Sequence, residues 1–302
     1  MKKVYNELNQ ATKNTQLNNP TYELKVFFND KEISLVHNEK EFSELNLHKQ
    51  LQSNLKEMLL SEMTEIQKNV IKLIDEGKDV MGCSKTGSGK TIAFLLPIIN
   101  KLLSNEIPHT PASHGVSYPV AIVLAPTREL VEQIYAEARK ICYKTNIIVT
   151  RVYGGVPHAP QLRDLRNGAD IIIATPGRLN DFINNSHINL ELAQNLIIDE
   201  ADRMLDMGFE PQINRIIYEY KMPAKDKRQN LFFSATFPKE VKELARNFMN
   251  NYYFVSVNNN NEAIANENIK HLLVQTSKGD ETNKLVELIK ELKGSILSNF
   301  FF

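Results

Sequence analysis

The chain has 302 residues, 42% of them hydrophobic, and its 36 basic and 36 acidic side chains give a formal net charge of zero. These values predict one large globular domain or two ordinary ones, and no apolar run is long enough to cross a bilayer. Because the net charge is zero, any nucleic acid must be held by local contacts and not by bulk attraction.

Cysteine usage and the first residues bear on the compartment. The two cysteines, Cys83 and Cys142, exclude a disulfide framework and a four-thiolate zinc site, and such low usage suits a reducing environment. The sequence starts in polar residues without the apolar core of a signal peptide. We therefore expect a cytoplasmic or nuclear protein with no membrane partner.

The N-terminal part of the sequence divides into an arm and a helical region. Residues 1–40 are rich in Asn, Lys, Glu and Gln and predict a mobile arm with a short extended segment at 24–28, whose deletion should cost the fold little. From residue 42 onward, apolar residues recur at helical spacing, first over 42–60 and then over 66–74. Two amphipathic helices are therefore expected before the main sheet.

Residues 79–257 alternate between short β-rich runs and helical stretches. The predicted strands are 79–83, 120–125, 147–153, 170–174, 196–199, 231–234 and 253–257. The predicted helices are 91–103, 129–143, 160–167, 178–183, 209–220 and 239–249. This alternation predicts an α/β fold with a mainly parallel sheet covered by helices on both faces, and ligands at the carboxyl ends of its strands.

A change of composition follows residue 257. Residues 258–268 are polar and of low complexity, as in an interdomain linker. Residues 269–302 contain one predicted strand (269–275) and one predicted helix (281–292), and chains below about 40 residues rarely build a core alone. We therefore expect a main domain over 41–257 and the incomplete start of a second domain over 269–302.

A phosphate-binding loop is predicted between the first strand and the following helix. Its residues are Ser84, Lys85, Thr86, Gly87, Ser88, Gly89, Lys90 and Thr91. In this context backbone N–H groups can surround an anion, Lys90 can reach the β- and γ-phosphates, and the Thr91 hydroxyl can hold Mg²⁺. The usual pattern begins with Gly where this chain has Ser84, and the alternative is a Gly/Ser turn beside an exposed lysine.

An acidic pair follows the strand at 196–199. Asp199 can hold Mg²⁺ directly or through water, and Glu200 can orient or deprotonate an attacking water. A solvated acidic loop is the alternative for an isolated Asp-Glu. The phosphate-binding loop earlier in the chain favours the catalytic interpretation.

These motifs, with several others in the same order, resemble the first RecA-like P-loop domain of DEAD-box RNA helicases over about residues 42–292. The segments that carry the resemblance are Asp199-Glu200-Ala201-Asp202, Ser234-Ala235-Thr236, Ala125-Pro126-Thr127-Arg128-Glu129-Leu130, Thr175-Pro176-Gly177-Arg178 and Gly154-Gly155. Residues 203–213 and 233–240 look specifically like the Vasa/Ded branch, whose members act on messenger RNA in translation or germ-cell development. Translation or germ-granule proteins are the partners that this branch implies.

The resemblance implies ATP and Mg²⁺ as ligands, with adenine recognised by Phe42 and Gln67. Phe42 would supply an apolar wall, and the Gln67 amide can pair bidentately with the adenine edge. The intervening stretch departs from the family, because this chain has Leu60, Glu62, Met63 and Glu65 where the branch has an aromatic residue, a basic residue and two prolines. We expect this departure to weaken ATP binding, and Lys85, where Gln is usual, to offset part of the added negative charge.

The resemblance also implies an RNA surface and a coupling element. The RNA-binding residues would be Pro126, Thr127, Arg128, Gly154, Gly155, Thr175, Pro176, Gly177 and Arg178. Helix starts, hydroxyls and guanidinium groups in these loops suit successive phosphates and sugars, which predicts little sequence preference. For one such loop alone, a capped helix would be the better interpretation. Ser234 and Thr236 would couple the two activities by reaching toward Asp202.

The family uses two RecA-like domains, and the second supplies arginine fingers worth ~10³–10⁵ in rate. We therefore expect the chain by itself to hydrolyse ATP poorly, and to gain activity from a second domain that it lacks. The alternative from another class is a non-catalytic ATP- and RNA-binding or partner-binding module.

Overall fold

The computed structural model describes residues 24–34, 39–104, 112–113, 115–257, 280 and 283–284. The chain divides into two units, residues 1–263 and 264–302. The predicted linker (258–268) and the predicted strand 269–275 lie outside the described residues, and so does most of the predicted helix 281–292. The domain limits proposed from the sequence stay predictions.

The described elements of the first unit follow the predicted alternation. In chain order they are β1 (Lys25–Phe28), β2 (Lys31–Ile33), η1 (Phe42–Glu44), α2 (Lys49–Glu57), α3 (Glu65–Asp75), β3 (Asp79–Cys83), α4 (Lys90–Leu103), β4 (Ala121–Leu124), α5 (Arg128–Ile141), β5 (Val149–Val152), α6 (His158–Leu165), β6 (Ile171–Ala174), α7 (Pro176–Asn184), β7 (Asn195–Ile198), α8 (Ala201–Asp206), α9 (Glu210–Tyr218), β8 (Gln229–Ser234), α10 (Lys239–Phe248) and β9 (Tyr252–Ser256). Every strand and helix predicted between residues 79 and 257 is present. The sequence did not predict α8, which is only six residues long.

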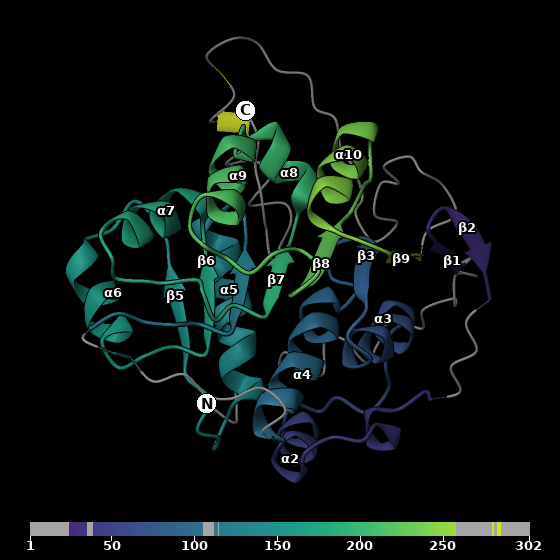
Figure 1. Cartoon of the computed structure of the whole chain (residues 1–302). Helices are drawn as coiled ribbons and strands as arrows, with labels where there is room; N and C mark the ends of the chain where they lie inside the picture. Colours follow the sequence, from purple (N-terminus) through teal and green to yellow (C-terminus); the bar gives the residue numbers. More distant parts are fainter. Residues whose placement is uncertain are drawn as a thin grey trace. The chain divides into compact units, whose positions relative to one another are not determined.

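The strands form one sheet in the order β2-β1-β9-β3-β8-β7-β4-β6-β5 (Figure 1). Strands β3 to β9 pair in parallel, whereas β1 pairs antiparallel with both β2 and β9. Helices cover both faces of this sheet. The predicted α/β architecture is therefore confirmed.

Alternation along the strands builds two hydrophobic cores, one on each face. In β4, Ala121 and Val123 pack into the core that α2, α3, α4 and α5 cover, whereas Ile122 and Leu124 pack into the core that α7, α9 and α10 cover. All four side chains are fully buried. This two-sided burial explains why the strands read as continuous apolar runs and not as alternating ones.

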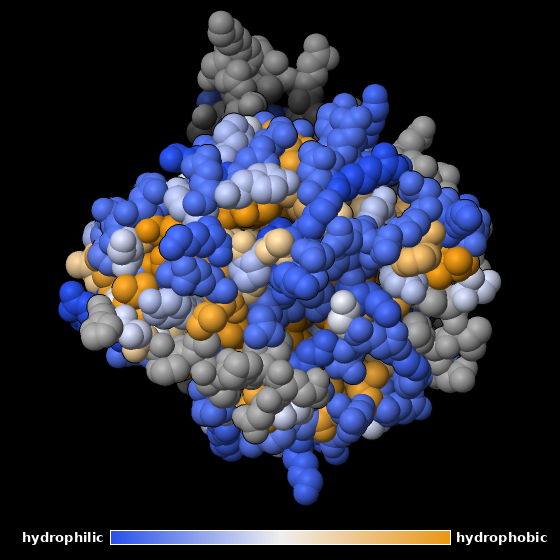
Figure 2. All heavy atoms as spheres, viewed as in Figure 1, coloured by the Kyte–Doolittle hydropathy of each residue, from blue (hydrophilic) through white to orange (hydrophobic). Residues whose placement is uncertain are grey.

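Surface composition agrees with this layering. On the face shown in Figure 2, hydrophobic side chains form small separate groups among hydrophilic ones. Among the described residues, no helix has both the length and the apolar content that a membrane span needs.

The predicted extended segment at 24–28 is β1, and it is hydrogen-bonded into the sheet. Val26 pairs with Val255 of β9 and Ile33 of β2, and its side chain is 3% exposed within the α2–α5 core. No local signal in the sequence reports a pairing partner more than 200 residues away. We therefore expect loss of residues 24–33 to cost stability, unlike the loss of a free arm.

Val26→Asp is expected to destabilise the fold by at least about 2 kcal/mol, because it buries a charge without a partner. Lys31→Asp, at an exposed position of β2, is the matched control and should have little effect. Urea unfolding followed by circular dichroism measures both. Equal midpoints for the two variants would contradict the packing of the hairpin.

Helix α2 ends in a Schellman motif that has leucine where glycine is usual. The N–H of Leu60 donates to the carbonyl of Leu55, and the N–H of Leu59 donates to that of Lys56, each at 3.0 Å. Leu59 has φ = 59° and is one of the most exposed large hydrophobic residues described. A left-handed conformation costs a residue with a Cβ atom roughly 1–2 kcal/mol.

Leu59→Gly is therefore expected to stabilise the protein by about 1 kcal/mol. Lys56→Gly, in the last helical turn, is the control and should destabilise it by about 0.5–1 kcal/mol, because glycine there loses more chain entropy. Chemical denaturation compares the two variants with the parent chain. A loss of stability in Leu59→Gly would show that the leucine side chain outweighs the backbone strain.

Candidate functional site

The phosphate-binding loop connects β3 to α4 and is closed by hydrogen bonds of its own. The Nζ of Lys90 donates to the carbonyl of Ser84 at 2.9 Å, and the Oγ atoms of Ser84 and Ser88 lie 2.8 Å apart. Gly87 and Gly89 have φ values of 76° and 91°, which glycine adopts without strain. The loop thus has a defined concave shape, with Lys90 buried at its base.

The loop opens onto a hollow of about 670 Å³, a size that suits a small-molecule ligand. The predicted residues that line it are Thr86, Gly87, Gly89, Lys90, Thr91, Asp199 and Glu200. Lys85 and Ser88 belong to the loop but not to this lining. Helix α5 forms another wall through Leu130, Gln133, Ala136 and Glu137. The last three of these lie outside every motif, because ordinary helical side chains leave no local signal of a site.

Asp199 is a buried acid at the end of β7. Burial is the largest influence on its pKa and raises it to about 6; the negative charge of Glu200 adds to the rise, whereas the positive charge of Lys90 opposes it. The N–H of Glu200 donates to Oδ1 of Asp199 at 3.0 Å. A carboxylate that is costly to ionise in the empty protein is well placed to receive a divalent cation, which would compensate its charge.

Glu200 adopts a left-handed backbone conformation, with φ = 51°. Such strain in a residue with a Cβ atom persists only where the surrounding structure imposes it, and it is common at functional sites. Oε2 of Glu200 lies 3.3 Å from Nη1 of Arg203, one turn into α8. The Glu200 side chain is half-buried and lines the hollow beside the phosphate-binding loop.

Asp199→Asn is expected to stabilise the metal-free protein by up to about 3 kcal/mol above pH 6. The reason is that the folded-state pKa, about 6, lies above the reference value of 3.8, so that ionisation opposes folding. The gain should shrink as the pH falls through 6 and disappear below about 4, where the acid is neutral in both the folded and the unfolded state.

Thermal unfolding in chelator, at about pH 8 and about pH 4.5, tests this pH dependence. Asp206→Asn, at an exposed position of α8, is the control and should show no such dependence. A stability gain of Asp199→Asn that is the same at both pH values would contradict the burial argument.

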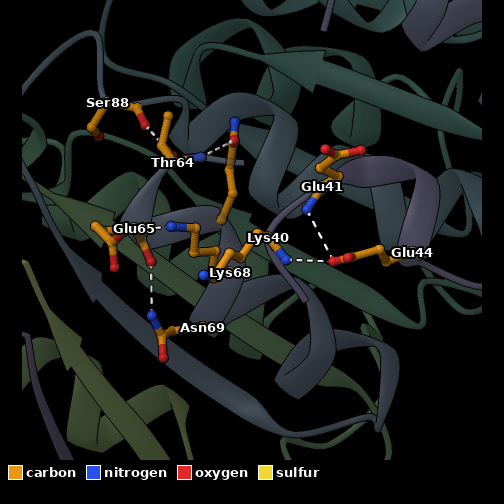
Figure 3. Close-up of polar contacts among 9 residues, drawn as sticks. Lys40, Glu41, Glu44, Thr64, Glu65, Lys68, Asn69 and Ser88 are labelled. Atoms are coloured by element: carbon orange, nitrogen blue, oxygen red, sulfur yellow. Dashed lines mark hydrogen bonds and ion pairs between the residues drawn. The ribbon is translucent and has the colours of Figure 1, made fainter. Parts of the chain in front are cut away.

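The segment predicted to recognise adenine contacts the phosphate-binding loop directly (Figure 3). Thr64 and Gln67 form a capping box at the start of α3, in which the N–H of Thr64 donates to Oε1 of Gln67 at 2.8 Å. The Thr64 hydroxyl donates to the carbonyl of Ser88 at 2.7 Å. Nε2 of Gln67 donates to the carbonyl of Gly89 at 3.1 Å. Both ends of the buried Gln67 amide are thus used by the protein itself.

This contact also explains a glycine. A Cβ atom at position 89 would collide with Nε2 of Gln67, so any other residue would displace the amide. Gln67 and Gly89 belong to separate sequence motifs, whereas Thr64 belongs to none. Its only sequence signal is its place before a helix that has Gln three residues later.

The other residues of this segment divide between core and solvent. Phe42 is buried and lines, with Leu60, a separate hollow of about 170 Å³. Met63 is buried, whereas Glu62 is exposed. Glu65 pairs with Lys68 at 2.6 Å, as Figure 3 shows. The structure therefore brings Phe42 and Leu60 together, but neither acid of this segment lines the hollow beside the phosphate-binding loop.

The predicted coupling residues are joined by hydrogen bonds. Oδ2 of Asp202 accepts from the N–H of Thr236 at 3.1 Å and from its hydroxyl at 2.8 Å, and the N–H of Asp202 donates to Oγ of Ser234 at 3.3 Å. Burial acts to raise the pKa of Asp202, but the contacts with Ser234 and Thr236 outweigh it and lower the pKa. The acid, in the first turn of α8, is thus held ionised against the end of β8.

Two of the predicted RNA loops are exposed at the same edge of the sheet. Thr127 caps α5 by accepting from the N–H of Leu130 at 3.2 Å, next to the buried Pro126, and leaves Arg128 exposed. In the second loop, Gly154 and Gly155 are exposed, and Gly155 has φ = 78°. These positions leave backbone groups and a guanidinium accessible to a polyanion.

The third loop differs from the expectation. Thr175, Pro176 and Gly177 begin α7, but Arg178 is only 7% exposed, and its Nη2 donates to the carbonyl of Val156 at 3.0 Å. Its guanidinium also lies 5.5 Å from the centre of the Phe182 ring. In this conformation Arg178 bonds to the residue that follows Gly154 and Gly155, the two residues called the glycine loop below. Its charge is not presented to solvent.

Comparison with known proteins supports the fold and identifies the family. Residues 64–244 match the DEAD/DEAH box helicase family. A hypothetical ATP-dependent RNA helicase from Sulfolobus tokodaii is 35% identical, with a TM-score of 0.59 over 69% of this chain and 56% of that chain. A DEAD box protein from the hyperthermophile Methanococcus jannaschii is 32% identical, with a TM-score of 0.63 over 83% of this chain and 64% of that chain.

The chain belongs to the DEAD/DEAH box helicase family, and its main domain has the RecA-like fold of such helicases. It spans less than two thirds of the length of either of the two similar proteins.

Proposed function

We propose that the chain is the first RecA-like domain of an ATP-dependent RNA helicase, which couples ATP binding and hydrolysis to RNA unwinding or remodelling. The observation that carries the proposal is the convergence of the phosphate-binding loop, Asp199 and Glu200 on one hollow. The sequence features of the Vasa/Ded branch at 203–213 and 233–240 support the finer proposal of a messenger-RNA substrate.

The residues present fit ATP with Mg²⁺. The loop's backbone amides and Lys90 would hold the phosphates, while Thr91 and Asp199 would hold the cation, which supplies charge neutralisation at the transferred phosphoryl group. Glu200 would orient the attacking water and accept its proton. The link from Gln67 through Gly89 suits a site in which base recognition and phosphate binding depend on each other.

The RNA surface is proposed to consist of the α5 start, the glycine loop and the α7 start. Contacts from Arg128 and from exposed backbone would engage phosphates and sugars, so affinity should fall as salt rises and should depend little on sequence. The Asp202–Thr236 hydrogen bonds would connect this edge to the catalytic acid at 200.

The first test of the proposal is nucleotide binding by Lys90→Ala. Loss of the ammonium group should weaken binding of ATP with Mg²⁺ by tenfold or more, as expected for about 1.5–3 kcal/mol from a charged hydrogen bond. Titration calorimetry measures the affinity, and Lys239→Ala, exposed on α10, is the matched control. Equal affinities for the two variants would refute the proposed nucleotide site.

The second test concerns turnover. Because the charge from one wall of a phosphoryl-transfer site is insufficient, the chain alone should hydrolyse ATP slowly and respond weakly to RNA. Adding a second RecA-like domain from a similar helicase, in trans or by fusion, should produce RNA-stimulated phosphate release, and Glu200→Gln should abolish it. Strong RNA-stimulated turnover by the chain alone would show that no second domain is required.

A non-catalytic ATP- and RNA-binding module is the second candidate function. A folded fusion that binds both ligands but releases no phosphate would favour this candidate.

A further inference from the structure

Glu132 of α5 contacts Arg151 of β5 and Tyr153, the residue that follows β5. It belongs to none of the motifs described above. Its Oε1 accepts a short hydrogen bond from the hydroxyl of Tyr153, and its Oε2 lies 3.0 Å from Nη1 of Arg151. Arg151 is also braced from the side, because its guanidinium lies 4.5 Å from the centre of the Tyr135 ring. One carboxylate thus ties α5 to β5.

Tyr153 in turn holds the start of the glycine loop. It directly precedes Gly154, and both its backbone groups bond to the Gln161 side chain, at 2.9 Å through the N–H and 3.0 Å through the carbonyl. The Tyr153 ring is almost fully buried. Burial and the hydrogen bond to Glu132 both raise the pKa of the phenol, which keeps it protonated as a donor.

The same ring supports the other RNA loop. The guanidinium of Arg128 lies 5.2 Å from the centre of the Tyr153 ring, a distance at which a cation is attracted to an aromatic face. Arg128 and Glu132 are four residues apart on α5 and so share a face of the helix. Arg128, Tyr153 and Glu132 therefore form one cluster that touches both exposed loops.

Gly154 and Gly155 have no side chains, so the position of this loop depends on contacts made by its neighbours. On the side that faces α7, Nη2 of Arg178 donates to the carbonyl of Val156, the next residue of the loop. On the side that faces α5, Tyr153 connects the loop to Gln161 and to Glu132. Without Glu132, the Tyr153 hydroxyl would lose its hydrogen-bond acceptor. The loop would then lose the contact that connects it to α5.

We propose that Glu132 is a positioning residue that sets the spacing between the Thr127–Arg128 loop and the Gly154–Gly155 loop, and thereby sets RNA affinity. It acts through Tyr153 and touches no ligand itself. This inference rests on the proposed RNA-binding function of the two loops.

The test is a double-mutant cycle on RNA binding. Glu132→Ala and Tyr153→Phe should each weaken binding of a single-stranded RNA by about tenfold, because each removes the same charge-assisted hydrogen bond. The double variant should be no weaker than the single ones, since residues in one interaction are not additive. Glu132→Gln should restore most of the affinity, because its amide oxygen still accepts from the phenol.

Three readouts separate positioning from general damage. Affinity for ATP with Mg²⁺ and the thermal midpoint should change little in Tyr153→Phe, whereas hydrogen exchange of the 153–157 backbone should become faster. Glu219→Ala is the matched control, because it removes an exposed Glu–Arg pair at 3.1 Å on α9. It should change neither the RNA affinity nor the hydrogen exchange of this backbone.

The outcomes distinguish this inference from the function on which it rests. If the parent chain binds no RNA, or if Arg128→Ala leaves RNA affinity unchanged, the proposed RNA surface is wrong, and the inference falls with it. If the parent chain binds RNA and Arg128→Ala weakens binding, additive effects of Glu132→Ala and Tyr153→Phe, or unchanged affinity in both, would overturn the inference alone.

Discussion

Burial of the central sheet on both faces is the constraint on which the rest of the structure depends. Helices cover the two faces, so polar groups of the parallel strands can reach solvent only at the strand ends. Strands β3, β7 and β8 end at Cys83, Ile198 and Ser234, which places the phosphate-binding loop, the acidic pair and the coupling hydroxyls at one edge. The site is thus a direct consequence of parallel topology.

Within that edge, side chains from separate motifs constrain one another more closely than the sequence suggests. Gln67 occupies the space that a Cβ atom at Gly89 would need, and Thr64 bonds to the neighbouring carbonyl. A ligand that engages Gln67 must therefore exchange hydrogen bonds with the protein, not simply add to them. Arg178 is likewise engaged within the protein, because its Nη2 donates to the carbonyl of Val156 beside the glycine loop.

Local signals predicted the elements, the phosphate-binding loop and the acidic pair, because these depend on periodicity and turn chemistry within a few residues. The adenine segment, the RNA loops and the coupling residues were expected only from the family resemblance. Strand β4, for example, is a continuous apolar run that any buried parallel strand would show. The role of β1, the burial of Arg178 and the cluster around Glu132 depend on partners distant in the chain, from about 20 residues away for Tyr153 to more than 200 for Val255. Such pairings leave no trace in local composition.

The β1–β2 hairpin has a practical consequence for any shortened form of this domain. A fragment that starts at Phe42, where the family resemblance begins, would leave unpaired backbone N–H and C=O groups on the edge of β9 that faces away from β3. β9 reads Tyr-Tyr-Phe-Val-Ser, a strongly β-forming segment without charge. Among the described strands, the outermost one on this side of the sheet is instead the short, charged β2, with exposed Lys31 and Glu32. The hairpin thus replaces an edge that would recruit other copies into aggregates with one that resists such recruitment.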